Sequence, residues 1–225
     1  MTAARVAGAI VTLLLLSAPA SAPAQSPPPP VRGASSLPST IPIFPLDDLM
    51  VFPNILRPLH VFEPRYRAMV AAALKGDRVI GMIQLRPGYE ANYEGRPPVF
   101  AMGCAGVITD FEQLPDGRYN IVLRGLVKFR ILSEDASLPY RVARVEAILE
   151  EPDNQERAAL GKQRERLVAL LPSGSERPPP AVPDEDVINT LAQYASIGPL
   201  QRQELIELKG PLLRSEALIA LLQGK

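Results

Sequence analysis

Four prolines interrupt the apolar segment between residues 41 and 62, and they constrain the fold more than any other feature of the chain. They stand at positions 42, 45, 53 and 58, among isoleucine, leucine, valine and phenylalanine residues. Because proline lacks a backbone N–H and fixes φ, it interrupts the hydrogen bonding of a sheet interior. We therefore expect short, interrupted strands at bends or at sheet edges.

A helical pattern starts directly after this segment, at Pro64. The apolar residues then follow at helical spacing, namely Tyr66, Met69, Val70, Ala73 and Leu74. Proline is favoured in the first turn of a helix, and Gly76 is suited to ending one. The pattern predicts one amphipathic helix that buries a single face.

Several later segments have the composition of β-strands. They cover residues 79–85, 99–109, 119–124, 127–132 and 140–149. The dipeptide Asp116-Gly117 accepts the positive φ of a hairpin turn, and Gly125 interrupts an alternating pattern as a bulge does. Because closure of a sheet removes unpaired edges, we predict that residues 41–151 form a small, partly open β-barrel with one packed helix.

The remaining part of the chain is predicted to be helical. Apolar residues share one side of the segments 155–171, 185–197, 199–208 and 211–222. We expect Asp184 to cap the second of these helices and the proline-rich stretch 173–183 to be a flexible joint. A helix with one apolar side must pack, so residues 152–225 are predicted to form a small helical bundle. The fold class is therefore α+β.

The N-terminus has the features of a cleavable export signal. Arg5 precedes an apolar core at residues 7–16, and small residues suited to cleavage follow. This core is too short to span a bilayer, which needs roughly twenty apolar residues. We expect a signal peptide at 1–24, a proline- and serine-rich disordered tether at 25–40, and a periplasmic or secreted protein without a stable membrane span once the leader is removed.

The chain resembles a known family at three places. The segment "FPL…VFP…PLHVFEPRY" between residues 44 and 66 is similar to the opening of the N-terminal substrate-binding domain of the Lon proteases, where several proline and aromatic positions match together. Residues 107–131 resemble the second signature of that family, and residues 140–146 resemble its closing strand. The likeness extends from about residue 42 to residue 222.

This resemblance implies a PUA-like pseudo β-barrel followed by a helical subdomain, as in stand-alone proteins made of the Lon N-terminal domain. It implies a non-enzymatic module that binds unfolded or partly folded polypeptides through their exposed apolar segments. Two departures from the Lon proteases stand out. The chain stops where the ATPase and peptidase modules would follow, and it carries a leader that a cytoplasmic protease lacks.

Residues that could carry chemistry are scarce. The chain has one histidine, His60, and one cysteine, Cys104, too few for a zinc site, and both are interpreted as structural residues. A glycine-rich loop ending in Gly-Lys-Ser/Thr is absent, so no ATPase is expected. We predict no catalytic residue, no metal site and no cofactor. Lys128 and the pair Glu150-Glu151 are interpreted as solvated.

Candidate peptide-binding residues come from two segments. Tyr89 and Tyr93 lie in a polar loop at residues 86–98, where aromatic side chains could contact a partner or cover the barrel. Glu63 and Arg65 could grip a peptide backbone, but Glu63 as a helix cap and Arg65 as the partner of a strand carboxylate is the favoured interpretation. An exposed strand edge could also add a strand from a partner. The phenylalanines at 44, 52 and 62 are assigned to the core.

Charge and composition narrow the partners. The formal net charge is zero and the basic residues between 124 and 144 lie on both strand faces, so no nucleic-acid partner is expected. Two alternatives to a polypeptide-binding module stay open. One is an uncharacterised exported hydrolase, and the other is a structural scaffold that forms a homodimer through its helical block.

Overall fold

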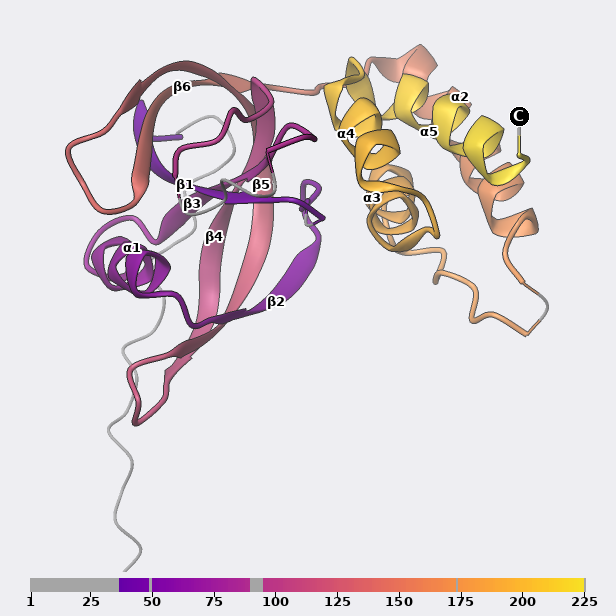
Figure 1. The fold of residues 1–225 in the computed structure, drawn as a ribbon. Helices are drawn as coiled ribbons and strands as arrows, with labels where there is room; N and C mark the ends of the chain where they lie inside the picture. The colour runs from indigo at the N-terminus through magenta and orange to yellow at the C-terminus, as the bar shows by residue number, and fades with distance from the viewer. Residues whose placement is uncertain (1–36, 49, 90–94, 173, 225) are drawn as a thin grey trace, which may run out of the picture.

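The computed structural model describes residues 37–48, 50–89, 95–172 and 174–224. Within this part of the chain, six strands and five helices form two blocks, one of strands with helix α1 and one of helices α2 to α5 (Figure 1). The α+β prediction is confirmed.

The first block contains all the strands. Its elements are β1 (Thr40–Leu46), β2 (Leu56–Val61), α1 (Pro64–Leu74), β3 (Val79–Gln84), β4 (Met102–Gln113), β5 (Tyr119–Asp135) and β6 (Arg141–Ile148). The second block follows a short connection after β6. Its helices are α2 (Asn154–Ala169), α3 (Asp184–Tyr194), α4 (Pro199–Glu207) and α5 (Gly210–Leu222).

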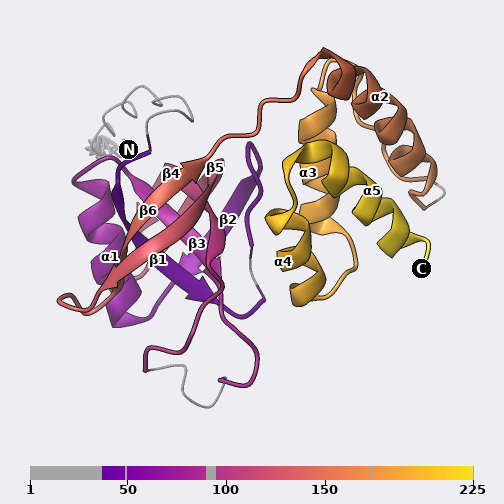
Figure 2. The ribbon, with the colours of Figure 1, turned by 90° about the horizontal axis from the view of Figure 1, so that it is seen from above.

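The strands form one mixed sheet in the order β2-β5-β4-β3-β1-β6. Strands β1 and β3 pair in parallel, and the other ladders are antiparallel. Strand β6 pairs with β5 as well as with β1. The pairings of all strands except β2 therefore form a closed circuit, β5-β4-β3-β1-β6-β5. Strand β2 pairs with β5 alone and lies on the side of the block that faces the helices (Figure 2).

Two prolines lie inside β1, which is not an edge strand of the whole sheet. Pro42 belongs to the half of β1 that pairs with β6, and Pro45 belongs to the half that pairs with β3. Each half therefore has a ladder on one side only, and a missing N–H can be accommodated on the other side. Pro58 lies in β2, which is an edge strand of the sheet, and this agrees with the prediction that the prolines lie at bends or at sheet edges.

The predicted hairpin between β4 and β5 is present. Gly117 has a φ of 83°, and Leu114 donates its N–H to the carbonyl of Arg118 at 2.8 Å. The two strands expected on either side of Gly125 are one continuous strand, β5, because a register shift beside Gly125 leaves Leu126 outside the β4–β5 pairing without ending the strand.

The larger apolar cluster extends from the strand block into the helices. It joins Phe52 and Met69 to Ile188, Leu205 and Leu218, so the two blocks share buried apolar contacts. The prediction that three phenylalanines lie in the core is confirmed for Phe44 and Phe52 but is wrong for Phe62, which is 60% exposed. The side chain of Phe62 instead stacks on the ring of His60 at 6.2 Å between centroids.

The helix ends follow local signals, with one correction. Asp153 and Glu156 form a capping box at the start of α2, with hydrogen bonds of 2.8 and 3.0 Å. Helix α3 starts after Pro183, so Asp184 lies in its first turn instead of capping it, and its carboxylate pairs with Arg164 at 3.0 Å. Among the described residues, no helix is both long and apolar enough to cross a membrane.

Candidate functional site

The predicted residues Glu63 and Arg65 bind each other at the start of α1. Their side chains form an ion pair of 3.0 Å, and the Arg65 guanidinium lies over the ring of Tyr66, 4.6 Å from its centroid. Glu63 occupies the N-cap position without a side-chain capping bond, and it supplies a carboxylate to Arg65. Arg65 and Tyr66 line a cavity of about 300 Å³.

Tyr89 lies beside the first helix residues of α4. It is 45% exposed and lines a second cavity, of about 230 Å³, with Pro199 and Leu200. Leu85 lines both this cavity and the one beside Arg65, so the structure places these two candidates in neighbouring hollows. Tyr93, the other aromatic candidate, lies outside the described residues.

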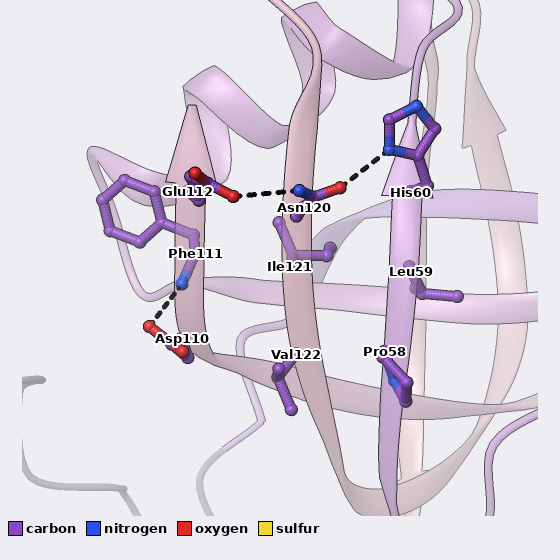
Figure 3. A pocket seen from close by; sticks show the side chains of 9 residues that line it. All are labelled: Pro58, Leu59, His60, Asp110, Phe111, Glu112, Asn120, Ile121 and Val122. Atoms are coloured by element: carbon purple, nitrogen blue, oxygen red, sulfur yellow. Dashed lines mark hydrogen bonds between the residues drawn. The ribbon is translucent and has the colours of Figure 1, made fainter. Parts of the chain in front are cut away.

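A wider groove, with a volume of about 580 Å³, runs across the outer face of β2, β5 and β4 (Figure 3). The strand registers place its lining in rows. One row is Glu112, Asn120 and His60, and the next is Asp110, Val122 and Pro58. Spacing along the sequence does not predict this groove, because its lining comes from β2 and β4, which become neighbours of β5 only through the order of strands in the sheet.

The first row is a hydrogen-bonded chain with a defined direction. Asn120 donates its amide N–H to Glu112 at 3.0 Å, so its oxygen accepts from Nδ1 of His60 at 2.7 Å. Nε2 of His60 then accepts from Arg118 at 3.2 Å. The neutral Nδ1–H tautomer satisfies both contacts. His60 is thus a hydrogen-bonded structural histidine, as predicted, although it is exposed.

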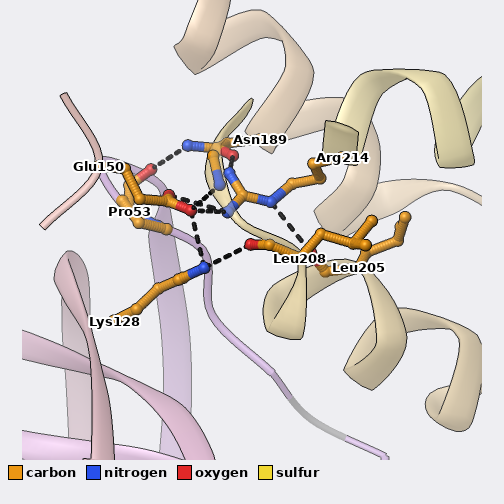
Figure 4. Close-up of polar contacts among 8 residues, drawn as sticks. Pro53, Lys128, Glu150, Asn189, Leu205, Leu208 and Arg214 are labelled. Carbon is orange, nitrogen blue, oxygen red and sulfur yellow. Dashed lines mark hydrogen bonds and ion pairs between the residues drawn. The ribbon is translucent and has the colours of Figure 1, made fainter. Parts of the chain in front are cut away.

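A buried ion cluster connects the two blocks (Figure 4). Glu150, which follows β6, accepts from Nζ of Lys128 of β5 at 2.7 Å, and both of its carboxylate oxygens lie 2.8 Å from Nη2 of Arg214 of α5. Lys128 also donates to the carbonyl of Leu208, and Arg214 donates to Asn189 at 2.6 Å. The interpretation of Lys128 and Glu150 as solvated is wrong, because the helical block covers them and their side chains are 1% and 13% exposed.

The charges in this cluster shift each other's protonation. Burial raises the pKa of the Glu150 carboxyl, but Arg214 and Lys128 outweigh burial and hold that pKa below its ordinary value. Burial lowers the pKa of the Lys128 ammonium despite the attraction of Glu150. Burial also raises the pKa of the nearby Cys104 thiol to about 12, which keeps it protonated and unreactive at neutral pH.

The depressed pKa of Glu150 predicts a loss of stability in acid. The free Glu of an unfolded chain titrates near pH 4.3, so the stabilisation by Glu150 is complete above that pH and disappears as the pH falls through its lower folded pKa. Urea unfolding between pH 7 and pH 3 should show that the free energy of unfolding falls more steeply with decreasing pH for the wild type than for Glu150→Gln. Parallel curves would show that Glu150 does not contribute to the acid dependence.

The arrangement defines a two-block α+β protein with several surface hollows and an open sheet edge. Among the described residues, no group of three or more metal-binding side chains gathers. The model of the ATP-dependent protease La (LON) substrate-binding domain family matches residues 40–224, and the chain belongs to this family. The resemblance found at the three sequence segments is thereby confirmed.

Curated relatives are Lon proteases, of which the chain covers about a fifth of the length. Lon protease 2 of Myxococcus xanthus is 29% identical over 162 residues, which are 69% of this chain and 20% of that protein. The Lon protease of Trichlorobacter lovleyi is 28% identical over 190 residues, which are 79% of this chain and 23% of that protein.

Solved structures show the same fold. The Lon N-terminal domain protein from Xanthomonas campestris has a TM-score of 0.56 at 22% identity, covering 80% of this chain and 97% of that one. The N-terminal domain of the Mycobacterium avium complex Lon protease has a TM-score of 0.59 at 20% identity, covering 82% and 98%.

Proposed function

We propose that this chain is a non-enzymatic module that binds exposed apolar segments of unfolded or partly folded polypeptides. The observation that carries the proposal is the match to a substrate-binding domain family over residues 40–224. Exposed apolar side chains support it, since Leu56, Phe62 and Tyr194 are each more than half exposed at 51%, 60% and 56%. Exposed apolar surface of this kind marks interaction sites when it gathers in one region.

The environment of the most reactive residue types favours binding over catalysis. The histidine ring is engaged by Asn120 and Arg118, and the thiol of Cys104 is buried and protonated. Nucleophilic catalysis needs a base positioned beside a nucleophile, and within the described part of the chain the ring of His60 bonds to Asn120 and Arg118 and to no serine or cysteine. We propose that binding takes place outside the cytoplasm, on the basis of the export signal expected from the sequence of residues 1–24.

Binding to an unfolded protein tests this function directly. The mature chain should bind fluorescein-labelled α-lactalbumin, reduced and S-carbamidomethylated to keep it unfolded, with micromolar affinity and without nucleotide. Fluorescence anisotropy measures the affinity, and native α-lactalbumin is the matched control that should not compete. If concentrations well above the micromolar range give no anisotropy change with this or several other unfolded proteins, the proposed function is wrong.

A further inference from the structure

We propose that the outer edge of β2 binds an extended polypeptide segment by adding it to the sheet as a further strand. This inference rests on the proposed function and assigns it a site and a binding mode. Strand β2 ends the sheet order and pairs with β5 alone. An edge strand presents backbone groups in the alternating pattern that another extended chain complements.

The alternation of hydrogen bonds identifies the open groups. The carbonyl of Val122 in β5 accepts from Thr109 of β4, so it points away from β2. The N–H of Gly125, three residues further, donates to Ile55 on the β2 side at 2.9 Å. Odd-numbered residues of β2 therefore bond to β5, and the backbone groups of Leu56, Pro58 and His60 point outward.

Two features restrict the length of an added strand. Pro58 has no N–H, and the carbonyl of Leu56 already accepts from the Tyr194 hydroxyl of α3 at 3.0 Å. The remaining outward groups are the N–H of Leu56, the carbonyl of Pro58, and both backbone groups of His60. The edge therefore suits a short segment centred on His60, and Pro58 protects it against longer edge-to-edge pairing.

Apolar side chains lie at both ends of this edge. Leu56 and Phe62 flank the open residues and are mostly exposed, and Tyr194 lies at the Leu56 end, where Arg57 is 5.9 Å from its ring centroid. An added strand places alternate side chains beside these groups. The bound segment should therefore carry β-branched or aromatic residues at alternate positions.

Charged residues in the rows that run from β2 across β5 to β4 add a preference for lysine in the bound segment. The rows of His60 and Pro58 contain Glu112 and Asp110, and neither carboxylate forms an ion pair with a described residue. Arg118, beside His60, is neutralised by Asp116 at 2.6 Å, while the Leu56 row contains Arg124. These carboxylates lie on β4, three strand spacings or roughly 14 Å from the added segment, which exceeds the Debye length of about 10 Å at 0.1 M salt, so they favour lysine near His60 only modestly.

The test uses the mature chain and labelled peptides of about ten residues that alternate valine with threonine and carry two lysines. The wild type should bind this peptide, and N-methylation of alternate peptide nitrogens should abolish binding. The key variant is His60→Pro, which removes the outward N–H without removing a β2–β5 bond. His60→Ala is its matched control, because it removes the same side chain and keeps the N–H.

We expect His60→Pro to bind the lysine peptide about tenfold more weakly than His60→Ala, as for loss of a hydrogen bond with some steric exclusion. A glutamate version of the peptide should bind about twofold more weakly to the wild type. Circular dichroism checks that both variants fold; if His60→Pro unfolds, the N-methylated peptide decides the question alone.

Two results would overturn this inference while leaving the proposed function intact. One is unfolded α-lactalbumin binding that is equal for the two His60 variants, together with unchanged binding of the N-methylated peptide. The other is loss of binding in Tyr89→Ala with no effect of His60→Pro, which would place the site beside α4. Absence of any polypeptide binding by the wild type would instead reject the proposed function.

Discussion

Glu150→Ala should lower the free energy of unfolding by about 3 to 5 kcal/mol, because it leaves two buried cations without their shared carboxylate. Lys128 and Arg214 both bind Glu150, and their side chains are 1% and 0% exposed. The same substitution removes the acceptor of the Gly210 N–H at the start of α5. Urea unfolding at pH 7 measures the loss.

Lys128→Met is the informative comparison for this prediction. It removes one cation and leaves the ion pair between Arg214 and Glu150 intact, so the remaining charges balance. Its cost should be clearly smaller than that of Glu150→Ala. If Lys128→Met lowers the free energy of unfolding more than Glu150→Ala does, or if Glu150→Ala lowers it by less than about 1 kcal/mol, the carboxylate is not the group that holds the two blocks together.

Local signals in the sequence predicted the elements well, but not what covers them. Pro64 and Pro199 mark helix starts because the first turn tolerates a missing N–H, and this preference does not depend on the rest of the fold. Lys128 lies between Val127 and Phe129 in β5, where alternation points it away from their side of the strand. The side of β5 on which Lys128 lies is covered by α4 and α5, and the position of these helices depends on tertiary packing.

Two features of the candidate site could be predicted from the sequence, namely the exposure of Phe62 and the edge position of β2. Alternation along β2 places Phe62 on the same side as His60 and opposite the buried Val61, so its exposure followed from a period of two. Pro58 indicated an edge strand, as observed. The rows that bring Glu112 and Asp110 behind that edge depend on pairing between distant strands, which spacing alone does not specify.

Gly125 fixes the segment that leads into β2, and this explains why a single methyl group there should be damaging. Its N–H and carbonyl bond to Ile55 and Asn54 at 2.9 Å. The preceding residues of this segment are held from the other side by Gln193 of α3, which bonds to the carbonyl of Met50 and the N–H of Phe52. The segment therefore aligns the start of β2 with the helical block.

Gly125→Ala should cost about 3 kcal/mol or more, because the new Cβ would lie 2.0 Å from the backbone carbonyl oxygen of Phe52, which cannot move without breaking these bonds. Gly161→Ala is the matched control. Its Cβ would meet Asp184 at 3.4 Å, an ordinary contact, and alanine inside α2 should raise stability by about 0.5 to 1 kcal/mol. Urea unfolding of both variants measures these opposite effects. Equal stabilities would mean that the segment before β2 yields to the methyl group, and that the edge of β2 is less firmly positioned than its hydrogen bonds indicate.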